Sequence, residues 1–174
     1  MRIQQRWRPG GAPESYHHRV SKGVRTMPST HFSLHYHLVF STKNRYPYIR
    51  TEWIDRLHAF LGGCVKTLGG IPKQVGGTLD HVHLLVDLKA THCLADVLRD
   101  IKKPTTDWVR KEIGSIKFTW QEGYGAFTVS ASNVAAVRRY IENQAEHHRR
   151  RSFQEEYCQI LEKHGVAYDE RYLW

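Results

Sequence analysis

Hydrophobic and polar residues alternate along the first patterned segment of the chain, residues 31–44. A period of two places every second side chain on the same face of an extended backbone, so this segment predicts a β-strand with one packed face. The apolar face consists of Phe32, Leu34, Tyr36, Leu38 and Phe40. In residues 50–64 the apolar positions instead recur at intervals of three and four, which predicts a helix.

Two strands and a second helix follow. Residues 71–80 and 81–88 have strand character, and the Val and Leu content of the second favours a central position in a sheet. Residues 91–114 return to the helical spacing of apolar side chains. Because proline removes a backbone hydrogen bond, Pro104 within this segment predicts a kinked or split helix.

The C-terminal third completes the pattern. Strand character returns in residues 116–130, and residues 131–151 and 152–165 predict two more helices. The first six elements have the order of a ferredoxin-like split βαβ fold. We therefore predict an α+β fold: an antiparallel sheet with helices on one face and an added C-terminal helix that lies across or beside the sheet.

The N-terminal residues lack this periodicity. Residues 1–29 are rich in Arg, Gly, Pro and Ser, which predicts a basic, disordered arm. Residues 30–174 then form a single domain of ordinary size. Met27 lies directly before the first patterned segment, so translation from either Met1 or Met27 agrees with the pattern.

The charge balance points to a partner. The chain has 26 Lys and Arg against 17 Asp and Glu, a net charge of +9, which favours nucleic acid over a membrane surface. No apolar stretch approaches the roughly 18 to 20 residues of a transmembrane helix, and the N-terminus lacks the apolar core of a signal peptide. We expect a cytoplasmic protein without a membrane partner. The three cysteines have neither disulfide-framework nor zinc-site spacing.

Two histidines stand one residue apart inside the strand predicted over residues 81–88. Side chains at i and i+2 of a strand share a face and lie roughly 6.5 Å apart, so His81 and His83 can converge on one metal ion. Val82 and Leu84 then point into the core. Taken alone, a His-x-His pair is more often ordinary surface than a metal site.

A third ligand and a nucleophile are available on the helix predicted over residues 131–151. Tyr140 and Gln144 are at i and i+4, so they occupy one face of that helix. Gln144 as third ligand would leave the ion its full charge for polarising a phosphodiester, and Tyr140 would be placed to attack. In the competing interpretation, Tyr140 packs in a hydrophobic seam with Val137 and Ile141.

Three separated motifs together resemble a known family. His81-Val82-His83 preceded by GGTLD, then WQEGYGAFTVS, then YIENQAEHH resemble the HUH-type transposases with a single catalytic tyrosine and their relatives associated with repeated extragenic palindromes. The resemblance covers the chain from about residue 30 onward. It implies a DNA strand transferase and endonuclease in which Tyr140 is the nucleophile, and His81, His83 and Gln144 bind a divalent metal, Mg²⁺ or Mn²⁺.

The resemblance also implies a reaction and its partners. Tyr140 would form a 5′-phosphotyrosine with a single DNA strand and free a 3′-hydroxyl, and strand transfer would follow when a 3′-hydroxyl attacks the phosphotyrosine. Covalent catalysis of this kind needs no ATP. Single-stranded DNA with hairpins is the implied substrate, bound by a homodimer whose tyrosine helix can complete the site in cis or in trans. The sequence offers no evident general base for Tyr140.

Basic and aromatic residues supply candidate DNA contacts. Unpaired bases can stack on aromatic side chains, for which Tyr46, Tyr48, Trp53 and Trp120 are candidates. Any single basic residue is more often just solvated, so the group predicts DNA binding better than its members do. The basic candidates are Lys43, Arg45, Lys102, Lys103, Arg138, Arg139, Arg149, Arg150 and Arg151.

Two other functions compete with a strand transferase. A non-catalytic nucleic-acid-binding module on the same fold would keep the basic surface, but it has no need of the His pair or the Tyr/Gln pair. A small phosphoesterase would want a second histidine motif on a partner strand, and His35-Tyr36-His37 is the candidate. We rank that motif below His81 and His83 because the resemblance matches the later pair.

Overall fold

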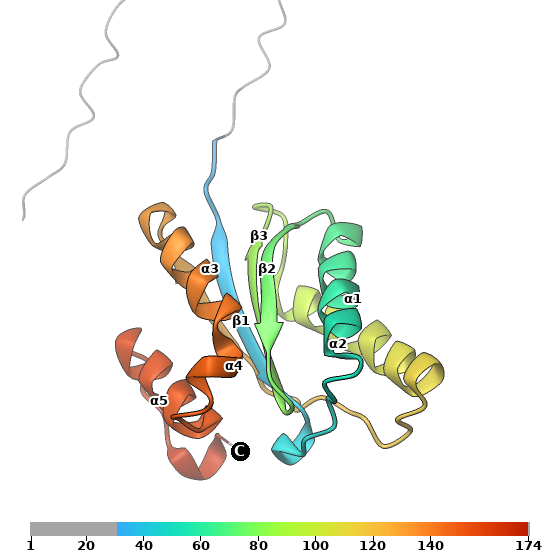
Figure 1. Ribbon diagram of the computed structural model, residues 1–174. Coiled ribbons are helices and arrows are strands. Elements are labelled where there is room, and N and C mark those ends of the chain that lie inside the picture. Colours follow the sequence, from blue (N-terminus) through green and yellow to red (C-terminus); the bar gives the residue numbers. More distant parts are fainter. Residues whose placement is uncertain (1–30, 174) are drawn as a thin grey trace, which may run out of the picture. The chain divides into compact units, whose positions relative to one another are not determined.

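The computed structural model describes residues 31–173, so the basic arm predicted over residues 1–29 lies outside the described residues. Within this range the chain forms a four-stranded antiparallel sheet with helices on both faces (Figure 1). The strand order is β2-β3-β1-β4, which places β1 and β3 at the centre. The α+β class predicted from the sequence is confirmed. The strands are β1 (His35–Ser41), β2 (Ile71–Gly77), β3 (His81–Asp87) and β4 (Gly125–Val129).

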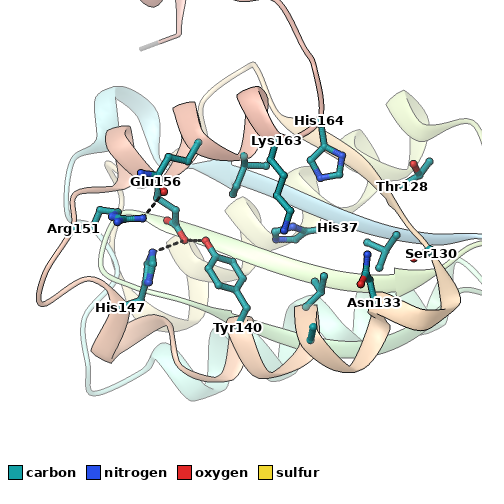
Figure 2. A pocket seen from close by; sticks show the side chains of 15 residues that line it. His37, Thr128, Ser130, Asn133, Tyr140, His147, Arg151, Glu156, Lys163 and His164 are labelled. Carbon is teal, nitrogen blue, oxygen red and sulfur yellow. Dashed lines mark hydrogen bonds and ion pairs between the residues drawn. The ribbon is translucent and has the colours of Figure 1, made fainter.

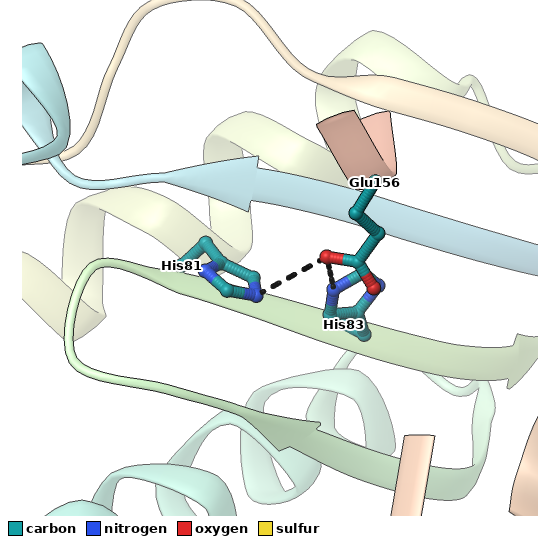
Figure 3. A group of neighbouring side chains, drawn as sticks. All are labelled: His81, His83 and Glu156. Atoms are coloured by element: carbon teal, nitrogen blue, oxygen red, sulfur yellow. Dashed lines mark ion pairs between the residues drawn. The ribbon is translucent and has the colours of Figure 1, made fainter. Parts of the chain in front are cut away.

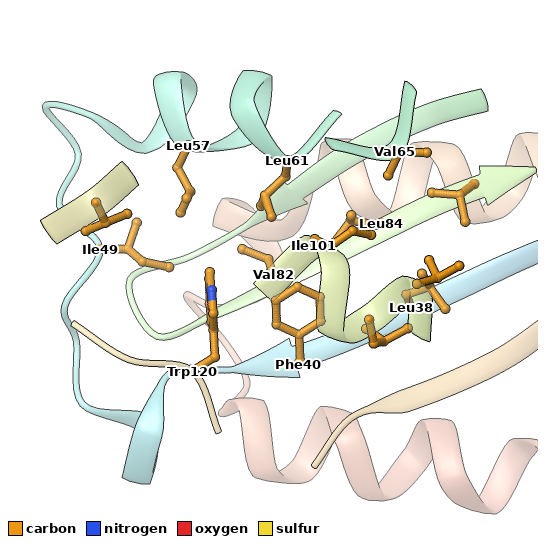
Figure 4. Packing of buried hydrophobic residues seen from close by; sticks show 14 of the residues in the cluster. Leu38, Phe40, Ile49, Leu57, Leu61, Val65, Val82, Leu84, Ile101 and Trp120 are labelled. Carbon is orange, nitrogen blue, oxygen red and sulfur yellow. The ribbon is translucent and has the colours of Figure 1, made fainter. Parts of the chain in front are cut away.

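Two helices, α1 (Ile54–Thr67) and α2 (Leu94–Trp108), cover the first face of the sheet. Alternate residues of the central strands point toward them and form the main core (Figure 4). Each fully buried aliphatic or aromatic side chain contributes roughly 1.5 to 3 kcal/mol relative to an exposed one. The core side chains labelled in that view are Leu38, Phe40, Ile49, Leu57, Leu61, Val65, Val82, Leu84, Ile101 and Trp120.

Helix α2 runs through Pro104 as one element, so the predicted split does not occur. Two threonine hydroxyls near the proline donate to main-chain carbonyls one turn back. Thr105 Oγ1 donates to the Ile101 carbonyl at 2.6 Å, and Thr106 Oγ1 donates to the Lys102 carbonyl at 2.9 Å. These bonds give carbonyls next to the proline an additional donor, which local sequence pattern does not reveal.

The second face is covered by α3 (Val134–Glu142), α4 (Gln144–His147) and α5 (Phe153–Lys163). The C-terminal part of the chain therefore contributes three helices where the pattern predicted two, and helices lie on both faces of the sheet rather than on one as predicted. The helix predicted over residues 131–151 is interrupted at Asn143, whose φ of −98° and ψ of 19° leave the helical region. Its side-chain amide and its main-chain N–H both donate to the Arg139 carbonyl, a local bond that competes with helix continuation.

Two glycines leave room for these helices to lie close to the sheet. A Cβ at Gly76 of β2 would lie 2.5 Å from the Ile141 carbonyl oxygen of α3. A Cβ at Gly125 of β4 would lie 3.0 Å from the Tyr157 ring of α5. Both glycines therefore permit an approach that a side chain would block.

Short helical turns connect the longer elements, and their bounds complete the description. None of the helices within residues 31–173 is long and apolar enough to cross a membrane. The turns are Lys43–Arg45, Ala131–Asn133 and Glu170–Tyr172, each of the 3₁₀ type, and Val109–Ile113, of the π type.

Candidate metal and tyrosine site

The histidine pair of β3 lies on the second face of the sheet and is fully buried. His81 is paired with Ser41 of β1, and His83 with Val39, so the two imidazoles follow one another along the middle of the sheet. Neither side chain is exposed. A buried pair of polar rings has to be satisfied by hydrogen bonds or by a cation, which distinguishes it from an ordinary surface pair.

The ring of His81 is oriented by the turn before it. Gly77, at φ +149°, lets the chain turn from β2 into β3, and Asp80 then accepts a hydrogen bond from His81 Nδ1 at 2.7 Å. Partial burial acts to raise the pKa of Asp80, but its interactions with His81, Thr78 and His148 together outweigh burial, so the net pKa is lowered. A carboxylate that fixes Nδ1–H leaves the Nε2 lone pair of His81 directed into the site.

His83 is oriented in the same way by a histidine of β1. Its Nδ1 lies 2.9 Å from Nε2 of His37, and burial lowers the pKa of His37 to about 4. Burial, reinforced by the neighbouring His81 and His37, also lowers the pKa of His83 well below its ordinary value. Both rings are therefore neutral, and Nε2 of His83 has no hydrogen-bond partner among residues 31–173.

A glutamate of α5, which the sequence analysis did not identify, lies opposite the two histidines (Figure 3). Glu156 Oε2 is 3.7 Å from His81 Nε2 and 3.6 Å from His83 Nε2, and the three ligand atoms of this group lie within 4.8 Å of one another. The side chain is 2% exposed. Burial, and secondarily the charge of Asp80, raises the pKa of Glu156 to about 8, so this carboxylate requires a proton or a cation nearby.

The start of α5 places Glu156 there. Ser152 and Glu155 form a capping box that fixes the first turn, and the Phe153 ring stacks on the ring of His81 with centroids 4.2 Å apart. Glu156 is three residues after Phe153 and four before Ile160, on the apolar face of the helix. An acidic residue on such a face is a signal that could have revealed it from the sequence.

Tyr140 and Gln144 both meet this carboxylate within the same chain. The Tyr140 hydroxyl donates to Glu156 Oε1, and Gln144 Nε2 donates to the same oxygen at 2.7 Å. The Gln144 oxygen lies 3.2 Å from His81 Nε2. His148 Nε2 lies 2.8 Å from Glu156 Oε2. The four residues predicted as nucleophile and ligands are therefore brought together, although Tyr140 and Gln144 lie on separate helices.

The arrangement of lone pairs fits a divalent cation. With Nδ1 of His81 protonated, its Nε2 and the Gln144 oxygen are both acceptors, yet they face each other. Nε2 of His83 and Oε2 of Glu156 bring the set to four ligand atoms. Of these, Nε2 of His83 has no hydrogen-bond partner among residues 31–173, whereas Oε2 of Glu156 lies 2.8 Å from His148 Nε2. Carboxylate and amide oxygens suit magnesium and manganese, whereas imidazole nitrogens suit zinc, iron and nickel, so the mixed set fits a divalent ion without selecting one.

The competing histidine motif does not form a second metal group with other side chains of residues 31–173. His35 Nδ1 lies 2.5 Å from Asp87, at the far end of the pairing between β1 and β3, and His37 serves as the hydrogen-bond partner of His83. The phosphoesterase interpretation therefore loses the second motif that it needs.

The predicted DNA-contact residues fall into two groups. Lys43, Arg45, Lys102 and Lys103 lie near β1 and on α2, whereas the five arginines from 138 to 151 lie on or after α3, toward the opposite face. Lys102 donates to the carbonyls of Gln121, Glu122 and Gly123, so its ammonium group is used within the fold. Of the stacking candidates, Trp53 and Trp120 are buried in the core, whereas Tyr46 is exposed.

Comparison with known proteins gives the family. Residues 30–144 match the family model described as IS200-like transposase, and the chain belongs to this family. Glu156 and α5 lie beyond the matched residues. No curated protein matches the sequence.

Two solved structures share the fold. A candidate transposase from Deinococcus radiodurans R1 has 25% sequence identity and a TM-score of 0.57, with 70% of this chain and 98% of that chain covered. A REP-associated tyrosine transposase bound to a REP hairpin has 15% identity and a TM-score of 0.52, with 70% and 74% covered. At 15% identity the second likeness shows the fold alone.

Proposed function

We propose that this chain is a metal-dependent transposase that cleaves and rejoins single-stranded DNA through Tyr140. The observation that carries the proposal is that the Tyr140 hydroxyl and the group of His81, His83 and Glu156 meet at one buried carboxylate. Membership of the IS200-like transposase family supports a role in DNA transposition. The hairpin bound to the second structural relative supports hairpin DNA as the substrate.

The reaction uses the tyrosine twice. The phenol oxygen attacks the phosphorus of one strand, the tyrosine–phosphate bond forms, and the bond to the 3′ oxygen breaks to leave a 3′-hydroxyl. A 3′-hydroxyl then attacks the phosphotyrosine and restores a phosphodiester. Glu156 Oε1 accepts the hydrogen bond of the phenol, so it orients the nucleophile and is the nearest acceptor for its proton.

His81, His83 and Gln144 remain our proposed metal ligands, and we add Glu156 to them. A bound Mg²⁺ or Mn²⁺ would polarise the phosphodiester as a Lewis acid. Asp80 and His37 hold the rings of the two histidines, and Gln144 also steadies Glu156. His81→Ala or Gln144→Ala should therefore lower metal affinity and cleavage together. Because DNA is the proposed substrate, we expect the protein to act in the cytoplasm. The family resemblance implies that it acts as a homodimer.

A covalent adduct on a denaturing gel tests the proposal. Purified protein is incubated with Mn²⁺ or Mg²⁺ and each single strand of the DNA that flanks its own gene. We expect an adduct that disappears with EDTA and in Tyr140→Phe, whereas Tyr124→Phe, which removes a phenol hydroxyl elsewhere, keeps it. An undiminished adduct in Tyr140→Phe would remove the nucleophile assignment. Tight hairpin binding without an adduct under any metal would favour the non-catalytic binding module.

A further inference from the structure

A pocket of about 340 Å³ opens beside Tyr140, between α3 and α5 (Figure 2). Its inner end is formed by Tyr140, His147 and Glu156, so it begins at the proposed nucleophile. From there it extends toward the start of α3 and the end of α5, where Asn133 and His164 line it. Whatever occupies the pocket therefore lies next to the atom that would attack the phosphate.

The lining suits a flat, partly polar ring. Val129, Val137 and Ile160 supply apolar surface, and the ring of Tyr140 is available for contact with a base. Side-chain amides and hydroxyls lie around them and can hydrogen-bond the edge of a base. These polar groups belong to Thr128, Ser130, Asn133 and Gln159.

The charge of the lining suits a nucleotide as well. Lys163 and Arg151 are the cations that line the pocket, and Glu156, the carboxylate among the lining residues, faces the histidines. Figure 2 shows the side chain of Lys163 directed toward His37. Its ammonium group makes no hydrogen bond or ion pair within the described range 31–173. A phosphate group would supply the missing partner.

We propose that this pocket binds one unpaired nucleotide that flanks the scissile phosphate, with its base between α3 and α5. A volume of about 340 Å³ is on the scale of a single nucleotide rather than a base pair. The pocket would therefore select single-stranded DNA at the cleavage position and fix the strand relative to Tyr140. This inference rests on the proposed function, because it takes the cleaved strand as the ligand.

Ala136 of α3 offers a direct way to fill the pocket. It lines the pocket and is exposed, so Ala136→Phe adds a ring in the space of the base without disturbing the core. Ala135 is also exposed but does not line the pocket, which makes Ala135→Phe the matched control. Lys163→Gln is a second test, paired with Lys66→Gln on α1 across the sheet.

Two readouts separate this inference from the proposed function. Single-strand affinity is measured without metal by fluorescence anisotropy, and adduct yield is measured with Mn²⁺ on strands carrying one abasic position at each site around the cleavage point. We expect Ala136→Phe and Lys163→Gln to weaken single-strand binding and adduct yield at least about fivefold, the lower end for loss of one stacked base. One flanking abasic position should cause a similar loss in the wild type and no further loss in Ala136→Phe.

The outcomes are distinct. If the wild type forms the adduct, but Ala136→Phe behaves like Ala135→Phe and no flanking base matters, the pocket is not a nucleotide site. If no strand gives an adduct, but Ala136→Phe loses single-strand affinity and Ala135→Phe does not, the pocket assignment stands and the proposed reaction fails. Absence of single-strand binding by the wild type overturns both. If Ala136→Phe melts at a lower temperature than the wild type, the lysine pair replaces it as the test. A loss of single-strand affinity in Lys163→Gln but not in Lys66→Gln supports the pocket, and equal affinities overturn it.

Discussion

The two faces of the sheet differ in what their buried residues do. The face under α1 and α2 buries the main aliphatic and aromatic core, whereas the face under α3 to α5 buries three histidines, a glutamine and a glutamate beside two smaller apolar clusters. Adjacent residues of β3 show the contrast, since His83 points to one face and Leu84 to the other. Apolar burial stabilises the fold, while buried ionisable groups cost free energy unless they are paired or bind a cation. The buried polar residues of the second face therefore indicate a metal-binding or catalytic role rather than a contribution to stability.

The largest effect is expected from replacing the buried carboxylate of Glu156. Glu156→Gln keeps the shape and one side-chain oxygen but removes the negative charge of a proposed ligand and the group that could take the proton of Tyr140, so we expect adduct yield to fall at least about 100-fold. Without metal at pH 7 the variant should melt at a higher temperature, because an uncompensated buried carboxyl group is costly. Gel quantification and circular dichroism check both effects.

Glu155→Gln is the matched control for this substitution. It alters the neighbouring residue, which belongs to the capping box, and should lower stability by about 0.5 to 1 kcal/mol while leaving the adduct in place. Equal adduct yields in Glu156→Gln and Glu155→Gln would remove Glu156 from the site.

The opposite face should respond in the opposite sense. Leu84→Ala deletes a fully buried side chain of the main core, and we expect a loss of about 2 to 5 kcal/mol in the free energy of unfolding. Urea denaturation measures this loss. Metal binding by the folded fraction should persist, whereas His83→Ala should abolish it. The reverse pattern would mean that the division between the faces is wrong.

A smaller effect is expected where α3 lies close to Gly76 of β2, and it should lower both the stability and the adduct yield. Gly76→Ala places a Cβ against the Ile141 carbonyl, so α3 has to shift, at a cost of about 1 to 3 kcal/mol and a weaker adduct. Gly63→Ala in α1 meets no neighbouring atom and should stabilise by about 0.5 to 1 kcal/mol. Thermal unfolding distinguishes them, and equal melting temperatures would contradict this account of the packing.

The smallest effect is expected from mixing variants. Tyr140, His81 and Glu156 meet within one chain, so Tyr140→Phe and His81→Ala proteins should not restore the adduct when they are combined. The adduct in the mixture should stay at the background of the separate variants. Recovery of a large fraction of wild-type yield would show that a homodimer completes the site in trans.

Much of the fold was predictable from local patterns. Alternation identified β1 and β3, and the order of elements gave the sheet topology, because both depend on periodicity. Two local features were not predictable in the same way. Helix α2 continues through Pro104, where Thr105 and Thr106 donate to nearby carbonyls. Helix α3 ends before Asn143, where a side-chain bond competes with the backbone.

The candidate site was predictable only in part. His81 and His83 share a face by strand geometry, and Gln144 and Tyr140 were proposed from their spacing and from the resemblance. Glu156 was missed because no motif links it to His81 and His83, which lie more than 70 positions earlier in the chain. Its contact with them arises only when α5 packs on the sheet. Its position on the apolar face of α5 was the available signal.

Binding of Mn²⁺ tests the central claim most directly, that the second face holds a metal site that includes Glu156. Isothermal titration of metal-free protein should give one Mn²⁺ per chain for the wild type and for Tyr140→Phe, with affinity at least about tenfold weaker in Glu156→Gln. Identical Mn²⁺ binding by Glu156→Gln and the wild type would contradict the account.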